Sequence, residues 1–208
     1  MRSRKMILLC AVLALVTVGG VASATASASF PEWHYGGTTL PEFEGETVVG
    51  AALSSSLKTA AGATTCAHFL YNMEAWNEFG WGDAWLNELP LFECTTTATH
   101  CTVTSIEAKN LPWFSFVENY SGKPYLVIDE INVKIGYGGT GCLLPKSVTL
   151  EGDAGGAINN TNSTATFSKA SFEATKTAMS IGTEKVEWTG EFTMEAFKAS
   201  RLKAVEVY

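Results

Sequence analysis

The chain has 208 residues, of which 46% are hydrophobic and 17% are charged, and this apolar content excludes a largely disordered protein. Its 14 basic and 21 acidic residues give a net charge of −7, with no basic cluster. This balance argues against a protein that binds nucleic acid or an anionic membrane surface.

The first 28 residues have the pattern of a secretory signal peptide. A basic head at residues 2–5 precedes an apolar run at 6–18, and the small residues that follow end in ASATASA. We predict cleavage after Ala28, with two earlier alanines as alternatives. The apolar run is shorter than the ~20 residues of a membrane span, which disfavours an uncleaved anchor. We therefore expect residues 29–208 to form a single secreted, extracellular domain without a stable membrane anchor. Without three signal-peptide cations its net charge is −10.

Short stretches of alternating or β-branched residues predict strands along the mature chain. In chain order they are 46–57, 63–73, 99–108, 131–135, 146–152, 164–175 and 185–196. The clearest is 185–196, whose period of two predicts that Trp188, Phe192 and Met194 face inward.

Glycine- and asparagine-rich stretches punctuate these strands and predict turns. They are KTAAG, YSGKP, GYGGTG, GDAGG and NNTNS. The best helix candidate, 74–89, contains Gly80 and Gly82, which weaken it. The pattern predicts one all-β domain, an antiparallel β-sandwich or β-barrel.

The mature chain keeps four cysteines, Cys66, Cys94, Cys101 and Cys142. An even number outside the cell predicts two disulfides, for which three pairings are possible. Zinc would need close pairs such as C-x₂-C, so we expect no metal. We favour Cys94–Cys101 across a short turn and Cys66–Cys142 between distant strands, but the pairing does not follow from sequence alone.

Two motifs that resemble catalytic or cofactor signatures lack their context. GYGGTG, residues 136–141, matches G-x-G-x-x-G but no helix is predicted after it, so we expect a turn and no cofactor. Ser55 and Lys58 have the S-x-x-K spacing of serine β-lactamases, whose partner motifs S-D-N and K-T-G are missing. We expect Ser55 to lie in a strand.

The three histidines, His34, His68 and His100, have no spacing typical of metal ligands. In a strand His68 would share a face with Cys66, which predicts a partly buried side chain. His100 would lie out of phase with Cys101, so we expect it to be exposed.

The segment 74–93 is unusually aromatic and acidic. Its tryptophans are Trp76, Trp81 and Trp85. One interpretation is a loop that folds its rings over an open end of the fold, because aromatic rings commonly fill cores. The other is an exposed platform for a sugar, a peptide or a partner surface, with Trp33 and Tyr35 as further candidates. The interleaved carboxylates must face water, so we predict that at least one of the three tryptophans is exposed.

The order of several elements resembles a family of secreted bacterial β-rich proteins without a known activity. These elements are a cysteine-bearing strand, a close cysteine pair, NLPW (110–113), GYGGTGC (136–142), NNTNSTATF (159–167) and a final EWTGEFTMEA (187–196). The resemblance covers about 45–196 and implies the Cys66–Cys142 and Cys94–Cys101 pairing. It implies no substrate and no catalytic residue.

Two function classes remain. The first, which we favour, is a non-catalytic binding or surface-structural module whose partner is a glycan or a cell-surface protein. The second is a small extracellular hydrolase with a site assembled from distant residues. An enzyme would need a concave site that holds shifted carboxylates or a positioned histidine.

Overall fold

The computed structural model describes residues 30–52, 54–59, 62–168, 180–181, 184–198 and 201–208. The predicted signal peptide and the end of the predicted 164–175 strand lie outside these residues. Within the described ranges the chain forms strands and turns, and no helix there is long and apolar enough to cross a membrane.

Seventeen strands make up the described fold. They are β1 (Trp33–Tyr35), β2 (Thr38–Thr39), β3 (Glu46–Ala52), β4 (Ser55–Thr59), β5 (Gly62–Glu78), β6 (Trp81–Glu88), β7 (Leu91–Thr96), β8 (Thr102–Ala108), β9 (Trp113–Tyr120), β10 (Lys123–Gly138), β11 (Ser147–Asn159), β12 (Thr164–Phe167), β13 (Ser180–Ile181), β14 (Glu184–Lys185), β15 (Glu187–Thr193), β16 (Glu195–Lys198) and β17 (Arg201–Val207).

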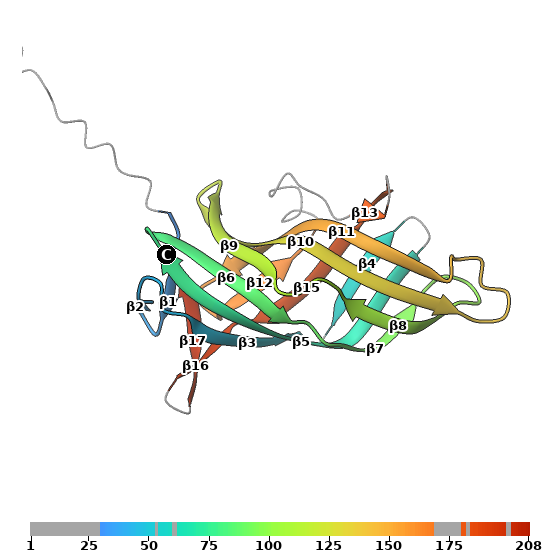
Figure 1. The fold of residues 1–208 in the computed structure, drawn as a ribbon, viewed down its shortest axis with the longest axis horizontal. Helices are drawn as coiled ribbons and strands as arrows, with labels where there is room; N and C mark the ends of the chain where they lie inside the picture. The colour runs from blue at the N-terminus through green and yellow to red at the C-terminus, as the bar shows by residue number, and fades with distance from the viewer. Residues whose placement is uncertain (1–29, 53, 60–61, 169–179, 182–183, 199–200) are drawn as a thin grey trace, which may run out of the picture.

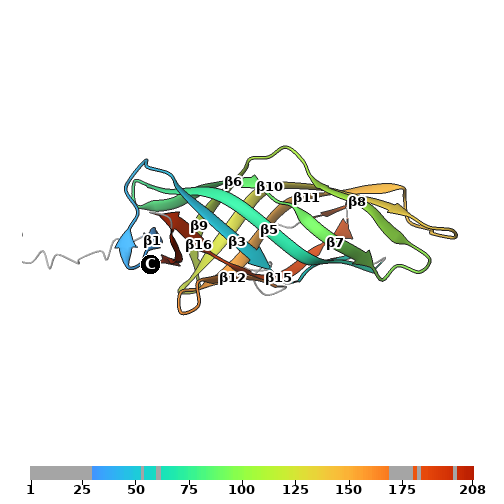
Figure 2. The ribbon, with the colours of Figure 1, turned by 90° about the horizontal axis from the view of Figure 1, so that it is seen from below.

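The sheet closes on itself. Antiparallel pairs run from β4 to β5, β6, β9, β10, β11, β12 and β15, and β15 pairs with β4 again. This closed circuit is a β-barrel, so it decides between the two predicted architectures (Figure 1). Long strands wind obliquely around the barrel, and β5 pairs with β4 and β7 along its first half and with β3 and β6 along its second (Figure 2).

The alternation of residues along each strand separates an apolar interior from the outer surface. On β9, Trp113, Ser115 and Val117 are buried, while the residues between them are partly exposed. The inward orientation predicted for Trp188, Phe192 and Met194 is confirmed, because all three are buried. The predicted 185–196 strand is interrupted, however, so that it spans parts of β14, β15 and β16.

Aromatic rings fill the middle of the barrel. They belong to Phe69, Phe167, Trp188 and Phe192, whose ring centroids lie 4.5–5.7 Å apart. The space left between these rings and neighbouring strands is a cavity of about 20 Å³. That volume is suited to about one water molecule, so the interior is a packed core.

The hydroxyl of Ser115 lines this cavity, is buried, and has no hydrogen-bond partner among the described residues. An unpaired buried hydroxyl is unfavourable. We therefore expect Ser115→Ala to raise the free energy of unfolding by about 1 kcal/mol in urea denaturation. Ser55→Ala is the control, because the Ser55 hydroxyl accepts a hydrogen bond from Trp188 and its loss should destabilise the protein. A destabilised Ser115→Ala protein would instead indicate a water bound in the cavity.

Strands β1, β2, β16 and β17 lie together at one end of the barrel (Figure 1). Trp33 of β1 is fully buried there, and its indole N–H donates to the carbonyl of Asp83 at 3.0 Å. The ring lies against Gly82 of β6, where a Cβ atom would stand 2.9 Å from the Trp33 ring and 2.4 Å from Val117. Glycine at this position therefore lets the terminal strand approach the barrel closely.

Two disulfides are present, but the favoured pairing was wrong. The bonds are Cys66–Cys94 and Cys101–Cys142. Cys66 lies directly opposite Cys94 in the β5–β7 pair. Cys101 precedes β8, which pairs with β10, and Cys142 lies in the turn that follows β10. Each disulfide thus joins segments that strand pairing brings together, whereas Cys94 of β7 and Cys101 before β8 belong to successive segments whose strands do not pair with each other.

Two local predictions were also wrong. The helix candidate 74–89 is the hairpin of β5 and β6, and its turn contains Phe79 and Gly80, both with positive φ. GDAGG, predicted to be a turn, lies inside β11. Glycine and alanine in these two segments thus occur both inside a strand and in a turn between strands. The turn predicted at GYGGTG begins within β10 and includes Gly139 and Gly141 at positive φ.

Candidate ligand-binding face

One outer face of the barrel combines aromatic and acidic side chains. It is formed by the outward positions of four adjacent strands, β5, β6, β9 and β10. These positions hold Glu74, Trp76, Glu78, Trp81, Asp83, Trp85, Phe114, Phe116, Glu118, Tyr125, Val127 and Asp129, of which Val127 is buried. We call these twelve residues the aromatic–acidic face. The inward positions between them are buried, so the alternation of the strands itself places rings and carboxylates outside.

Four rings form a continuous ladder across three strands. The Trp76 and Trp85 centroids lie 6.3 Å apart, Trp85 and Phe114 lie 5.2 Å apart, and Phe114 and Phe116 lie 6.0 Å apart. The two tryptophans are inclined by 35° and the two phenylalanines by 29°, while Trp85 and Phe114 meet at 64°. The ladder therefore presents two facets, one of tryptophan and one of phenylalanine.

Strand register places a carboxylate within the ladder. Asp83 lies opposite Trp76 on one side and opposite Phe116 on the other. Glu74 likewise lies opposite Trp85. Hydrogen-bond acceptors thus lie beside stacking rings of the neighbouring strands.

The predicted exposure of the tryptophans is found in the structure. Trp85 is 40% exposed and Trp81 is 38% exposed, while Trp76 is partly buried. Trp81 also stacks on Phe30, with ring centroids 3.5 Å apart. The further candidate Trp33 is fully buried and does not join an exposed platform. Tyr35 is partly buried, with the ammonium of Lys203 5.1 Å from its ring centroid.

Two carboxyl groups of the aromatic–acidic face have raised pKa values, because their surroundings disfavour the charged form. Partial burial, followed by repulsion from Glu78, raises the pKa of Asp83. Partial burial raises the pKa of Asp129, and nearby acidic side chains add to the effect, with Asp153 the largest of them. Carboxyl groups with perturbed pKa values cluster at functional sites and also occur in structural charge networks.

We expect Asp83→Asn to stabilise the protein slightly at neutral pH. The pKa of Asp83 is higher in the folded protein than in the unfolded chain. At pH values between these two pKa values the folded state binds more protons than the unfolded state, so the free energy of unfolding falls as pH rises. The gain in Tm should therefore be full at neutral pH and vanish below the usual Asp pKa of ~3.9. It should be small, because solvent screens this partly exposed group. Glu74→Gln, at an exposed position of the same face, should change Tm less.

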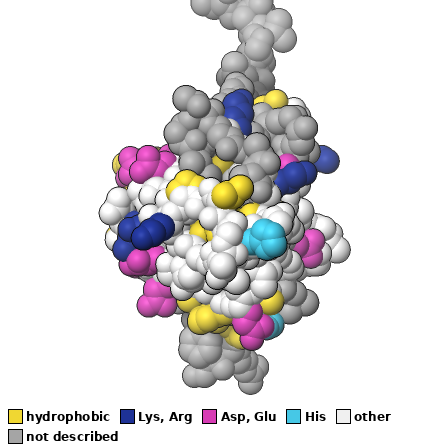
Figure 3. Space-filling view, turned by 90° about the vertical axis from the view of Figure 1, so that its right-hand side faces the viewer, with side chains coloured by type: hydrophobic (Ala, Val, Ile, Leu, Met, Phe, Trp, Pro, Cys, Tyr) yellow, Lys and Arg dark blue, Asp and Glu magenta, His cyan; other side chains and the backbone are white. Residues whose placement is uncertain are grey.

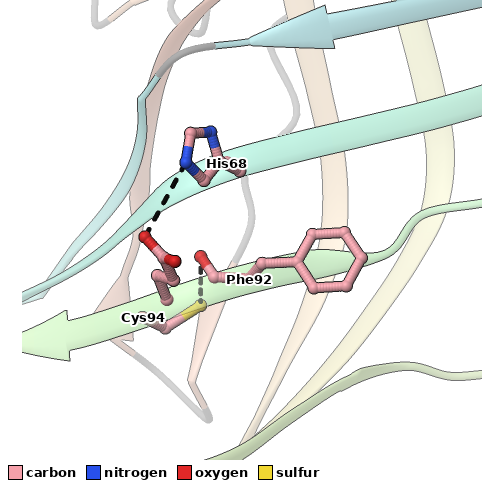
Figure 4. A network of polar contacts seen from close by, with 4 residues as sticks. His68, Phe92 and Cys94 are labelled. Atoms are coloured by element: carbon pink, nitrogen blue, oxygen red, sulfur yellow. Dashed lines mark hydrogen bonds and ion pairs between the residues drawn. The ribbon is translucent and has the colours of Figure 1, made fainter.

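A second polar group lies on β5 and β7, next to the first disulfide (Figure 4). The His68 Nε2 atom lies 3.7 Å from a carboxylate oxygen of Glu93, and both side chains are well exposed. His68 was predicted to be partly buried on the Cys66 face, and this prediction was wrong. Cys66 and Phe69 are both buried, so the alternation along β5 changes phase between them and His68 lies outside.

This histidine group has no catalytic geometry. The Cys94 sulfur lies 3.8 Å from the Phe92 carbonyl oxygen, but a disulfide sulfur has no proton to donate, so the contact is not a hydrogen bond. An exposed ion pair contributes little to stability or orientation. His100, predicted to be exposed, is exposed.

Two hollows on the barrel surface, of about 470 and 400 Å³, are lined by other residues. The first lies between 87–91 and 106–111, and the second lies beside β3 and β5. Neither contains Asp83 or Asp129, the carboxylates with raised pKa values. In these two hollows, the lining residues and the carboxylates with raised pKa values are therefore separate features.

The end of the barrel that carries the β10–β11 turn has a different surface (Figure 3). Most of its described area in this view is neither charged nor hydrophobic, and the charged side chains lie mainly toward its edges. Threonine and glycine dominate the segments there, including TTTATHCTVT at 95–104. The combination of rings and carboxylates therefore distinguishes the aromatic–acidic face from this end.

Comparison of the chain with protein-family models, with curated proteins and with solved structures finds no match. The resemblance to secreted bacterial β-rich proteins therefore stays a prediction.

Proposed function

We propose that this protein is a secreted, non-catalytic binding module that holds a glycan on its aromatic–acidic face. The observation that carries the proposal is the outward-facing ring ladder from Trp76 to Phe116, in which Trp85 is exposed and the other three rings are partly buried, with Asp83 between its rings. Sugar rings present apolar C–H faces that stack on aromatic rings and hydroxyls that donate to carboxylates. A ladder interrupted by acceptors offers both contacts.

The steps between successive rings favour a chain ligand over a single sugar. They measure 5.2–6.3 Å, close to the repeat of one pyranose along a β-linked glycan. The core supports a site on the outer face, because the cavity between the core aromatic rings is about 20 Å³ and is suited to about one water molecule. The two disulfides indicate an oxidising environment, in keeping with an extracellular module.

The test is binding of the purified protein to an array of glycans, followed by titration of the best ligand. We expect Trp85→Ala to weaken binding about tenfold or more, because loss of one stacking ring removes about 1–3 kcal/mol by analogy with base–aromatic stacking. Phe92→Ala is the matched control, since Phe92 is a similarly exposed aromatic residue on β7, outside the face. Equal losses for both variants, or no glycan bound at all, would contradict the proposal.

A further inference from the structure

The charge on the aromatic–acidic face is of one sign. Five of its twelve residues are carboxylates, and the stretches 74–78, 81–85, 114–118 and 125–129 contain no lysine or arginine. Glu74, Glu78 and Asp83 make no ion pair with any described residue. The nearest cation on these strands is Lys123, opposite Tyr120 at the end of the β9–β10 hairpin.

We infer that the ligand is a polycationic glycan, a chain of amino sugars whose amines are free and protonated. This inference rests on the proposed function and names its ligand class. Rings and carboxylates together are the pair of groups that bind organic ammonium ions, through cation–π attraction and charge-assisted hydrogen bonds. A neutral glycan would use the rings but would leave Glu74, Glu78 and Asp83 without partners of opposite charge among the described residues.

Asp83 is the residue best placed to select the amine. It lies opposite two rings of the ladder, Trp76 and Phe116, so a sugar stacked on either ring brings its ring substituents near this carboxylate. Glu74 repeats the arrangement beside Trp85. An amine on each sugar of a chain would therefore meet carboxylates at successive rings.

Two other occupants fit less well. A second copy of the chain would bring the same five carboxylates against each other in an isologous contact, which like-charge repulsion opposes. A basic extended peptide commonly binds by adding a strand to a sheet edge. Here β6 and β9 are each paired on both sides along the face, so this surface offers side chains and no backbone edge.

The experiment compares three β-1,4-linked oligomers of equal length that differ only at carbon 2. Glucosamine oligomers carry an ammonium group there, N-acetylglucosamine oligomers a neutral amide, and cello-oligosaccharides a hydroxyl. Titration by calorimetry at a pH below the pKa of the sugar amine should show the glucosamine chain binding about tenfold tighter than either neutral chain at low salt. The advantage should shrink at high salt, because exposed charges are screened.

Variants separate charge from stacking. Asp83→Asn should abolish most of the preference for glucosamine and should weaken the neutral chains much less, because the amide oxygen of asparagine still accepts from sugar hydroxyls. Trp85→Ala should weaken all three chains. Equal affinities for the three chains in the parent protein would overturn the inference and leave the proposed function standing. If no glycan binds, both fail. Polylysine that binds as tightly as glucosamine, with no effect of Trp85→Ala, would indicate a basic protein partner and overturn the inference.

Discussion

Replacement of Asn77 by alanine is expected to lower the free energy of unfolding by about 3–5 kcal/mol, because each buried polar group left unpaired costs about 1–3 kcal/mol. Asn77 is 0% exposed. Its Nδ2 atom donates to the carbonyls of Trp33 and Leu40, each at 3.0 Å, and its Oδ1 atom accepts from the Trp33 N–H at 2.8 Å. One side chain on β5 thus satisfies three backbone groups of the N-terminal segment.

The isosteric Asn77→Asp variant separates hydrogen bonding from packing. A carboxylate keeps the volume but cannot donate to the two carbonyls, so it should be at least as damaging as alanine at neutral pH. Asn72→Ala is the control, because Asn72 lies on the same strand and is not buried. Urea denaturation gives the free energies, and amide hydrogen exchange should show β1 opening first. A change below 1 kcal/mol for Asn77→Ala would mean that the segment is not anchored through this residue.

The role of Asn77 shows where sequence reasoning reaches its limit. Alternation along a strand depends only on neighbouring residues, so the inward set around Trp188 was readable in advance. Asn77 satisfies groups 37 and 44 positions away, and nothing near it in the sequence signals those partners. The predicted disulfide pairing was wrong for the same reason. Cys66 meets Cys94 because β5 and β7 pair, and that pairing is a property of the closed barrel.

The candidate face was half predictable. Trp76, Trp81 and Trp85 stood out because they cluster between carboxylates within one segment. Phe114 and Phe116 were missed because they lie 29 or more residues beyond Trp85 and join the ladder only through the β6–β9 pair. An F-x-F pattern on a strand predicts two rings on one side of that strand. Here the alternating residues Trp113, Ser115 and Val117 are buried, so the two rings lie outside. The face on which the rings lie can thus be predicted from the alternation of a single strand. The strand that pairs beside it cannot.

Replacement of Trp188 by alanine should lower the free energy of unfolding by about 3–5 kcal/mol, as is typical of a buried aromatic residue. Trp188 is 5% exposed, and its ring lies 5.0 Å from Phe167, 5.6 Å from Phe69 and 5.7 Å from Phe192. Its indole N–H donates to the Ser55 hydroxyl at 2.6 Å, across the β15–β4 pair that closes the barrel. The substitution therefore leaves a cavity at the centre of the core and removes the side-chain hydrogen bond between β15 and β4, the two strands that close the barrel.

Two variants apportion this loss. Trp188→Phe keeps an aromatic ring but lacks the donor, so it should lose about 1–3 kcal/mol and leave most of the ring packing intact. Trp85→Ala removes the same side chain from an outward position on β6 and should cost less than half as much as Trp188→Ala, because solvent already reaches 40% of that ring. Equal losses for the two tryptophan-to-alanine variants in urea denaturation would mean that the inward and outward faces of the strands have been assigned incorrectly. A large loss confined to Trp188 would leave Trp85 available as a binding residue, because its exposed ring would then contribute little to the stability of the fold.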